Sequence, residues 1–179
     1  MKLLQLLPIG KLDDNLLRGL QGGIPQFVDV LCEVLPPVLD PAPALHSERQ
    51  QYHSSEILRR MQDLVTRRTW RLLGVTSLDL YIPILTFVFG EAQMGGPCAL
   101  VSTYRLRQEF YGLQPDFELL QQRLLKEAVH ELGHTLDLKH CHDYECVMAS
   151  AHAVEWIDLR GPALCEACRT QMMSSVSEV

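Results

Sequence analysis

Residues 129–141 read VHELGHTLDLKHC, and this stretch predicts both the fold and the chemistry of the chain. His130 and His134 are four residues apart, so on a helix they project about 40° apart from one face and can both reach a zinc ion at roughly 2.0–2.1 Å. Glu131 lies on the flank of that face. No continuous helix could bring His140 to the same ion, so the helix must end and the chain must turn back sharply.

Three histidine nitrogens would leave one zinc position for water, which distinguishes a catalytic zinc site from a structural one. A glutamate between the first two ligands is typical of a metallohydrolase, in which it serves as general base and then as general acid. The ordinary alternatives are a solvated helix glutamate at Glu131 and a pair of core imidazoles at His130 and His134. The third histidine and the cysteines that follow it favour the metal site.

Four cysteines and a methionine complete the pattern H-E-x-x-H-x₅-H-C-x₄-C-x-M-x₁₆-C-x₂-C, and they are Cys141, Cys146, Met148, Cys165 and Cys168. The four thiols have spacings that one structural zinc accepts. Because Cys141 is bonded to His140, a zinc held by its sulfur would also fix where the third histidine points. Separate reduced thiols, a disulfide and a redox C-x-x-C pair are the weaker alternatives.

This pattern resembles that of the archaemetzincins, zinc metallopeptidases of the metzincin clan. RQQY at 49–52, VFGEA at 88–92 and VSTYRL at 101–106 are also similar to family sequence, so the resemblance covers most of the chain. It implies a metzincin-like α/β fold, in which a twisted mixed sheet, a backing helix and an active-site helix stand above a small zinc-stabilised C-terminal subdomain. It further implies that Met148 supports the metal from a tight turn beneath it, and that residues 88–92 form an edge strand along the cleft.

One position departs from the metzincin pattern, because Asp137 stands where these proteins usually carry glycine. The turn needs a positive φ, and aspartate is among the few other residues that enter that region, at a cost of about 1–2 kcal/mol. We expect His140 to be the third ligand, and His142 is the alternative after a distorted turn.

Composition limits the partners and the compartment. The 179 residues are 47% hydrophobic, enough for one globular domain with a core of its own. The net charge of −6 argues against nucleic acid and against an anionic membrane as partners. No signal peptide or membrane span is recognisable, so we expect a cytoplasmic protein with reduced thiols, in which Cys32 and Cys98 are buried. His46, His53 and His152 lack metal-ligand spacing and are expected at the surface or at caps.

Hydrophobic periodicity predicts alternating strands and helices before the metal motif. We expect an upper α/β subdomain over 1–136, a lower subdomain over 137–173 and a disordered tail over 174–179. The expected strands are 2–8, 27–35, 78–82 as a central strand, 85–92 and 99–106. The expected helices are 13–21, one that starts from an N-cap at Ser54 or Ser55, and a long helix that Pro115 and Asp116 open.

The sequence therefore predicts a zinc metallopeptidase with two zinc ions per chain, which acts on a peptide or protein substrate. A second hypothesis is a catalytically weak or inactive zinc-stabilised peptide-binding module on the same fold, which a turn displaced at Asp137 would favour. A Cys₄-zinc adaptor for nucleic acid is disfavoured by the acidic charge. The sequence says nothing about oligomeric state, side-chain preference, or endopeptidase against exopeptidase action.

Overall fold

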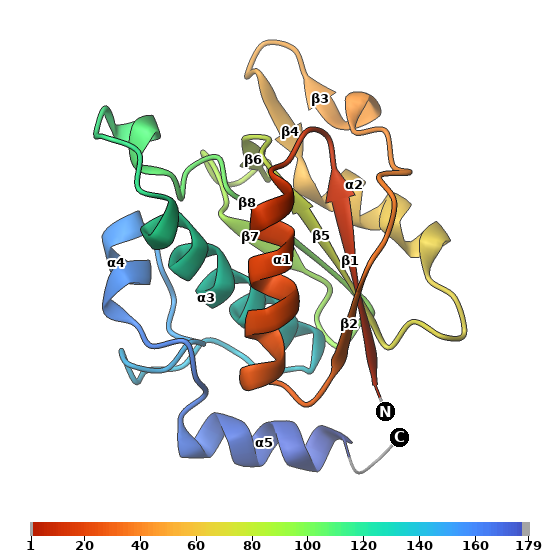
Figure 1. Ribbon diagram of the computed structural model, residues 1–179, viewed down its shortest axis with the longest axis vertical. Helices are drawn as coiled ribbons and strands as arrows, with labels where there is room; N and C mark the ends of the chain where they lie inside the picture. The colour runs from red at the N-terminus through yellow and green to blue at the C-terminus, as the bar shows by residue number, and fades with distance from the viewer. Residues whose placement is uncertain (1, 177–179) are drawn as a thin grey trace.

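The computed structural model describes residues 2–176, and its centre is a five-stranded sheet with helices on both faces (Figure 1). Four neighbouring strands are parallel, and the fifth runs antiparallel along one edge. In spatial order they are β2 (Leu31–Val34), β1 (Leu3–Ile9), β5 (Arg71–Thr76), β8 (Cys98–Ser102) and β7 (Gly90–Ala92).

Two hydrophobic cores lie on opposite faces of the sheet. Helices α1 (Asp14–Gly23) and α3 (Phe117–Thr135) cover one face, and α2 (Ser54–Met61) covers the other (Figure 1). Alternate residues of β1 supply both cores: Leu4 and Leu6 enter the first, and Leu7 and Ile9 enter the second. Strands that are buried on both faces need apolar residues at nearly every position, which explains the leucine-rich N-terminal run.

Shorter elements complete the upper part of the molecule. A three-stranded sheet has the order β3 (Leu45–His46), β4 (Gln51–His53) and β6 (Leu80–Tyr81). The 3₁₀ turns are η1 (Ile24–Gln26), η2 (Ala42–Ala44), η3 (Gln62–Leu64) and η4 (Gln108–Tyr111).

The chain after α3 has a small core of its own. Leu138, Val147 and Met148 pack there against Val129 of α3, together with Cys146 and Cys168. This part also contains α4 (Val154–Leu159) and α5 (Glu166–Val176), and α5 lies at the lower edge in Figure 1. Within residues 2–176, no helix combines the length and apolar character that crossing a membrane requires.

The predicted central strand over 78–82 is wrong. Only Leu80–Tyr81 is extended there, and it belongs to the small sheet. The strand at the centre of the large sheet is β5, which the sequence analysis did not identify. Its residues are buried on both faces, so they do not alternate between apolar and polar side chains, and Gly74 interrupts the run. A Cβ at Gly74 would lie 2.9 Å from side-chain atoms of Leu100 and Met61, so a larger residue there would require these side chains to shift.

Other predicted boundaries also change. Of the strand predicted over 85–92 only Gly90–Ala92 is extended, and residues 27–35 contribute only Leu31–Val34. The predicted serine N-cap of α2 is wrong, because His53 holds the cap position without a side-chain hydrogen bond. The helix α5 continues to Val176, and residues 177–179 of the expected tail lie outside the described part of the chain.

Candidate metal centre

Helix α3 ends in a turn that reverses the chain beneath its last residues. Leu138 N donates to Gly133 O at 3.1 Å, and Asp137 N donates to His134 O at 3.0 Å, which is the hydrogen-bond pattern of a Schellman motif. Asp137 takes the positive φ (62°) that this motif needs at its C′ position. The substitution of glycine by aspartate therefore leaves the turn in place, and residue 140 comes back beneath the helix.

Three imidazoles converge at this turn. The nitrogens that His130, His134 and His140 offer all lie within 4.8 Å of one another. The Nε2 atoms of His130 and His134 are 3.1 Å apart, close to the roughly 3.3 Å that two nitrogens at zinc-bond length span across a tetrahedron. Among the described residues, His142 does not join this group, so the turn selects His140. This donor set fits zinc.

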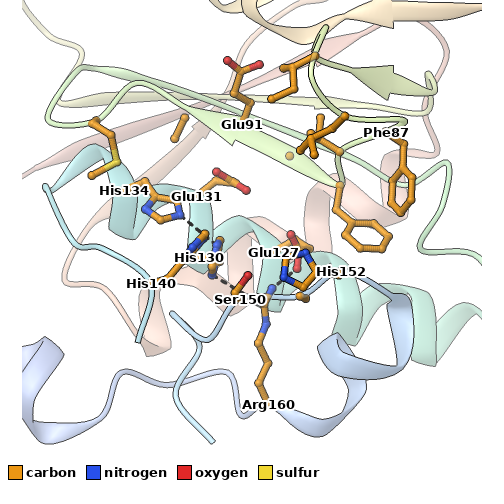
Figure 2. Close-up of a pocket in the computed structure, with 18 of the residues that line it drawn as sticks. Phe87, Glu91, Glu127, His130, Glu131, His134, His140, Ser150, His152 and Arg160 are labelled. Atoms are coloured by element: carbon orange, nitrogen blue, oxygen red, sulfur yellow. Dashed lines mark hydrogen bonds and ion pairs between the residues drawn. The ribbon is translucent and has the colours of Figure 1, made fainter. Parts of the chain in front are cut away.

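Backbone carbonyls orient two of the rings. His130 Nδ1 lies 2.8 Å from Val147 O, and His134 Nδ1 lies 2.7 Å from Leu138 O. The tautomer with the proton on Nδ1 donates to each carbonyl and leaves each Nε2 with a lone pair for a metal, and the two Nε2 atoms face each other (Figure 2). Both carbonyls belong to the segment after α3, so the chain reversal that delivers the third histidine also holds the first two.

The surroundings keep the imidazoles neutral. Burial lowers the pKa of His130 well below its ordinary value, and the guanidinium of Arg160 and the ring of His134 act in the same direction. Burial also lowers the pKa of His134 and of His140. Neutral imidazole is the form that binds metal, so these side chains are held in the ligating state at neutral pH.

Glu131 is buried beside the three histidines. Burial raises the pKa of its carboxyl well above the ordinary value, Glu127 and Glu91 raise it further, and Arg160 opposes them. The edge strand β7 passes directly over it: a Cβ built on Gly90 would lie 2.8 Å from Glu131 Oε1. Because residue 90 has no side chain, the strand can approach the carboxylate this closely.

The four cysteines predicted to bind a second metal form one cluster. The sulfurs of Cys141, Cys146, Cys165 and Cys168 lie within 4.8 Å of one another, and all six cysteines of the chain are free thiols. The sulfurs of Cys141 and Cys165 are 3.8 Å apart, which is about the edge of a tetrahedron with Zn–S bonds of roughly 2.3 Å. This donor set also fits zinc.

Hydrogen bonds join the cysteine cluster to the histidine centre. Cys141 N donates to Met148 O at 2.9 Å, and Met148 N donates to Cys146 Sγ at 3.4 Å. Met148 is fully buried, and its thioether lies against Gly133 of α3. The methionine predicted to support the site therefore packs under the helix that carries the histidines.

A cleft of about 550 Å³ opens over the three histidines and Glu131. Strand β7 lines it, in agreement with the edge position predicted for residues 88–92. His152, expected at the surface, is exposed and lines the lower side of the cleft (Figure 2). His46 and His53 lie elsewhere, in ring contacts with Tyr81.

The buried pair of Glu127 and Arg160 was not predicted from the sequence. Arg160 donates to Glu127 and also to Ala149 O at 2.6 Å, and both charged side chains are almost fully buried (Figure 2). Glu127 precedes Glu131 by four residues and so lies on the same helix face, a signal that was available. The sequence around Arg160 carries no such signal.

Comparison with known proteins extends over both clusters. The model of peptidase family M54 matches residues 42–174. The archaemetzincin of Methanocaldococcus jannaschii is 40% identical over 166 residues, which cover 90% of this chain and 87% of that protein. The crystal structure of archaemetzincin from Archaeoglobus fulgidus, complexed with malonate, has a TM-score of 0.81 at 33% identity and covers 94% of this chain and 99% of that one. A zinc-dependent peptidase from Methanocorpusculum labreanum has a TM-score of 0.86 at 25% identity, with the same coverage.

Proposed function

Because the chain belongs to peptidase family M54, the archaemetzincins, and is a zinc metallopeptidase, we propose that His130, His134 and His140 hold its catalytic zinc while Glu131 transfers the protons. The observation that carries this proposal is the convergence of three neutral imidazoles beside one buried carboxyl. Bound zinc supplies Lewis acidity toward a water molecule and toward the carbonyl of the peptide bond that is cleaved.

Glu131 accepts a proton from the attacking water and delivers it to the leaving amine. Its burial supports this role, because a carboxyl whose pKa is raised takes up a proton readily. Gly90 leaves room for the carboxylate beneath the strand, so that the side chain is held without a clash.

The edge strand β7 aligns the substrate. It pairs with β8 on one side only, and its other edge faces the cleft. An extended peptide can add to such an edge by main-chain hydrogen bonds, which recognise any sequence. The substrates of the family are peptides or proteins, so this mode of binding suits them.

Cys141, Cys146, Cys165 and Cys168 hold a second, structural zinc, which gives two zinc ions per chain. The spacing of their sulfurs supports this assignment. A site filled by four thiolates has no open position for substrate. Its role is to fix the loop between His140 and Met148 under the catalytic centre.

The alternative of a peptide-binding module without turnover loses its main support. That reading depended on a displaced turn at Asp137, whereas Asp137 adopts the left-handed conformation and residue 140 reaches the other two histidines. The cytoplasmic location stays a prediction of the sequence alone.

The proposed function is tested by Glu131→Gln, with Glu118→Gln in the exposed first turn of α3 as the matched control. Zinc content is measured by mass spectrometry of the metal, and cleavage is measured on a synthetic peptide library. We expect both variants to keep two zinc ions, and Glu131→Gln alone to lose about 10²–10⁴-fold in kcat. Cleavage by Glu131→Gln at the rate of the parent would contradict the proposal.

A further inference from the structure

Residues 82–88 form the upper wall of the cleft, and apart from Thr86 the side chains of this segment are apolar. Leu85 lines the cleft although it is 49% exposed. The half-buried Phe87 also lines it (Figure 2), and its ring packs edge-to-face on the buried Phe89, with ring centroids 5.1 Å apart. Apolar side chains that remain exposed beside a metal centre indicate a surface that a ligand covers.

The wall is an irregular loop, and Arg49 holds its backbone. Arg49 Nη2 donates to Leu85 O at 3.0 Å and to Thr86 O at 2.9 Å, so one guanidinium fixes two successive carbonyls. Gln51 assists: its Nε2 donates to Thr86 O at 2.9 Å, and its Oε1 accepts from Arg49 Nε at 2.8 Å. The RQQY segment that resembles family sequence thus acts on the wall of the cleft.

The backbone between these two side chains is strained. Gln50 is one of two non-glycine residues with a positive φ (53°) in the described chain, and the other is Asp137 in the metal-site turn. Such strain persists only where the surroundings impose it, and it concentrates at functional positions. Here it turns the chain so that Arg49 and Gln51 both face the loop, while the guanidinium of Arg49 lies 4.1 Å from the ring centroid of Tyr81.

The same network reaches Phe87. Gln51 Nε2 also donates to Asp79 Oδ2 at 3.1 Å. Asp79 accepts two hydrogen bonds from Arg105, at 2.6 and 2.8 Å, and the guanidinium of Arg105 lies 4.3 Å from the ring centroid of Phe87. The carbonyls of the wall and one of its aromatic rings are therefore fixed by one connected set of polar groups.

We propose that Arg49 is a substrate-positioning residue, which holds residues 82–88 as a preformed wall against which a bulky apolar side chain of the peptide packs. The proposal rests on the proposed peptidase function for its kinetic consequences. The contacts of Arg49 are with the wall, Gln51 and Tyr81 rather than with the metal centre or Glu131, so it acts on substrate through the wall. Loss of the guanidinium leaves the chemistry in place and weakens the binding of such peptides.

The first test is amide hydrogen exchange of residues 82–88 in the zinc-loaded protein, which needs no turnover. Arg49→Met is compared with the control Arg59→Met. Arg59 also donates two side-chain hydrogen bonds, but its partner is the carboxylate of Glu56 on the surface of α2. We expect exchange in residues 82–88 to become about tenfold faster in Arg49→Met, with β5 unchanged, and to stay at the parental rate in Arg59→Met. Parental exchange in Arg49→Met overturns the proposal.

The second test uses a peptide that the parent cleaves, in which each position is replaced in turn by alanine. At the position that packs on the wall, alanine raises the KM of the parent about tenfold. We expect Arg49→Met to raise the KM of the original peptide by a similar factor with kcat within twofold, and to remove the effect of that alanine substitution. If Arg49→Met and the alanine substitution in the peptide instead raise KM independently, so that their factors multiply when both are present, the proposal is overturned.

A third variant covers the case in which Arg49→Met does not fold. Leu85→Ser changes an exposed wall side chain and so leaves the core intact, and we expect the same selective rise in KM. An unchanged KM in Leu85→Ser overturns the proposal. If the parent cleaves no peptide, the proposed function fails instead, and binding of fluorescent peptides to zinc-loaded Glu131→Gln then decides the role of the wall.

Discussion

Gly133 and Met148 are in such close contact that a Cβ on Gly133 would lie 2.4 Å from Met148 Sδ. Gly133 stands between the two histidines of α3, and Met148 is fully buried beneath them. A glycine inside a helix is ordinarily unfavourable, so this one is explained by the room it leaves for the thioether. The contact fixes the height of the helix above the loop that follows His140.

Gly133→Ala should destabilise the protein by roughly 1–2 kcal/mol, because overpacking of the buried methionine outweighs the better helix propensity of alanine. Gly22→Ala in α1 is the matched control, since nothing lies within 4 Å of a Cβ there, and it should stabilise by about 0.5–1 kcal/mol. Urea unfolding of both variants measures the difference. A stabilised Gly133→Ala protein would show that the contact is unimportant.

Gly90→Ala should lower kcat about 10²-fold with zinc content unchanged. A Cβ at that position would lie 2.6 Å from Leu100 O and 2.8 Å from Glu131 Oε1, so either the strand or the carboxylate must move. A displacement of about 1 Å at a catalytic group can lower the rate of the chemical step by about 10²-fold. Steady-state kinetics with metal analysis measures the effect, and a kcat within twofold of the parent would refute this prediction.

Arg160→Met should cost about 3–5 kcal/mol in free energy of unfolding, because it leaves the buried carboxylate of Glu127 without its partner. The double variant Glu127→Leu with Arg160→Met should cost less than the single one, since no charge is then buried alone. A double-mutant cycle in urea measures the coupling between the two side chains. Simple additivity would mean that the ion pair contributes nothing specific.

The metal-free protein should lose stability as the pH falls below about 6.5. The pKa of each of the three metal-site histidines is lowered in the folded state, so the unfolded chain binds more protons in this range and unfolding becomes favourable. His140→Gln should reduce the slope of the free energy of unfolding against pH. Equal slopes in the parent and in His140→Gln would contradict the assignment.

Cys165→Ala should release one zinc ion per chain and weaken zinc binding at the histidine centre several-fold, because the loop from His140 to Met148 loses its anchor. Cys32→Ala, which removes a thiol that is not part of the cluster, should keep both metals. Metal analysis after dialysis against a graded chelator measures both effects. Retention of two zinc ions by Cys165→Ala would refute the second site.

The long helix and the turn after it could be predicted because their signals are local. Asp116 caps α3 through a hydrogen bond to Leu119 N, and the spacing of the histidines required a reversal that only a few residue types permit. Aspartate is one of those types. Asp137 does adopt the positive φ that the turn requires.

The central strand and the buried ion pair could not be predicted because their determinants are not local. Strand β5 is buried on both faces, so its apolar run carries no period that separates strand from helix. Arg160 meets Glu127 only after α3 and the C-terminal segment have packed together. Arg49 likewise acquires its role from a loop more than 30 residues further along the chain.

Anomalous diffraction at the zinc edge from crystals of the zinc-loaded protein tests the central claim most directly. We expect one zinc at roughly 2.0–2.1 Å from a nitrogen of each of His130, His134 and His140, with its fourth position open to solvent or substrate. We expect a second zinc within the four cysteines. Histidine rings that point apart, or a protein atom in the fourth position of the first zinc, would contradict a catalytic zinc site at these three histidines.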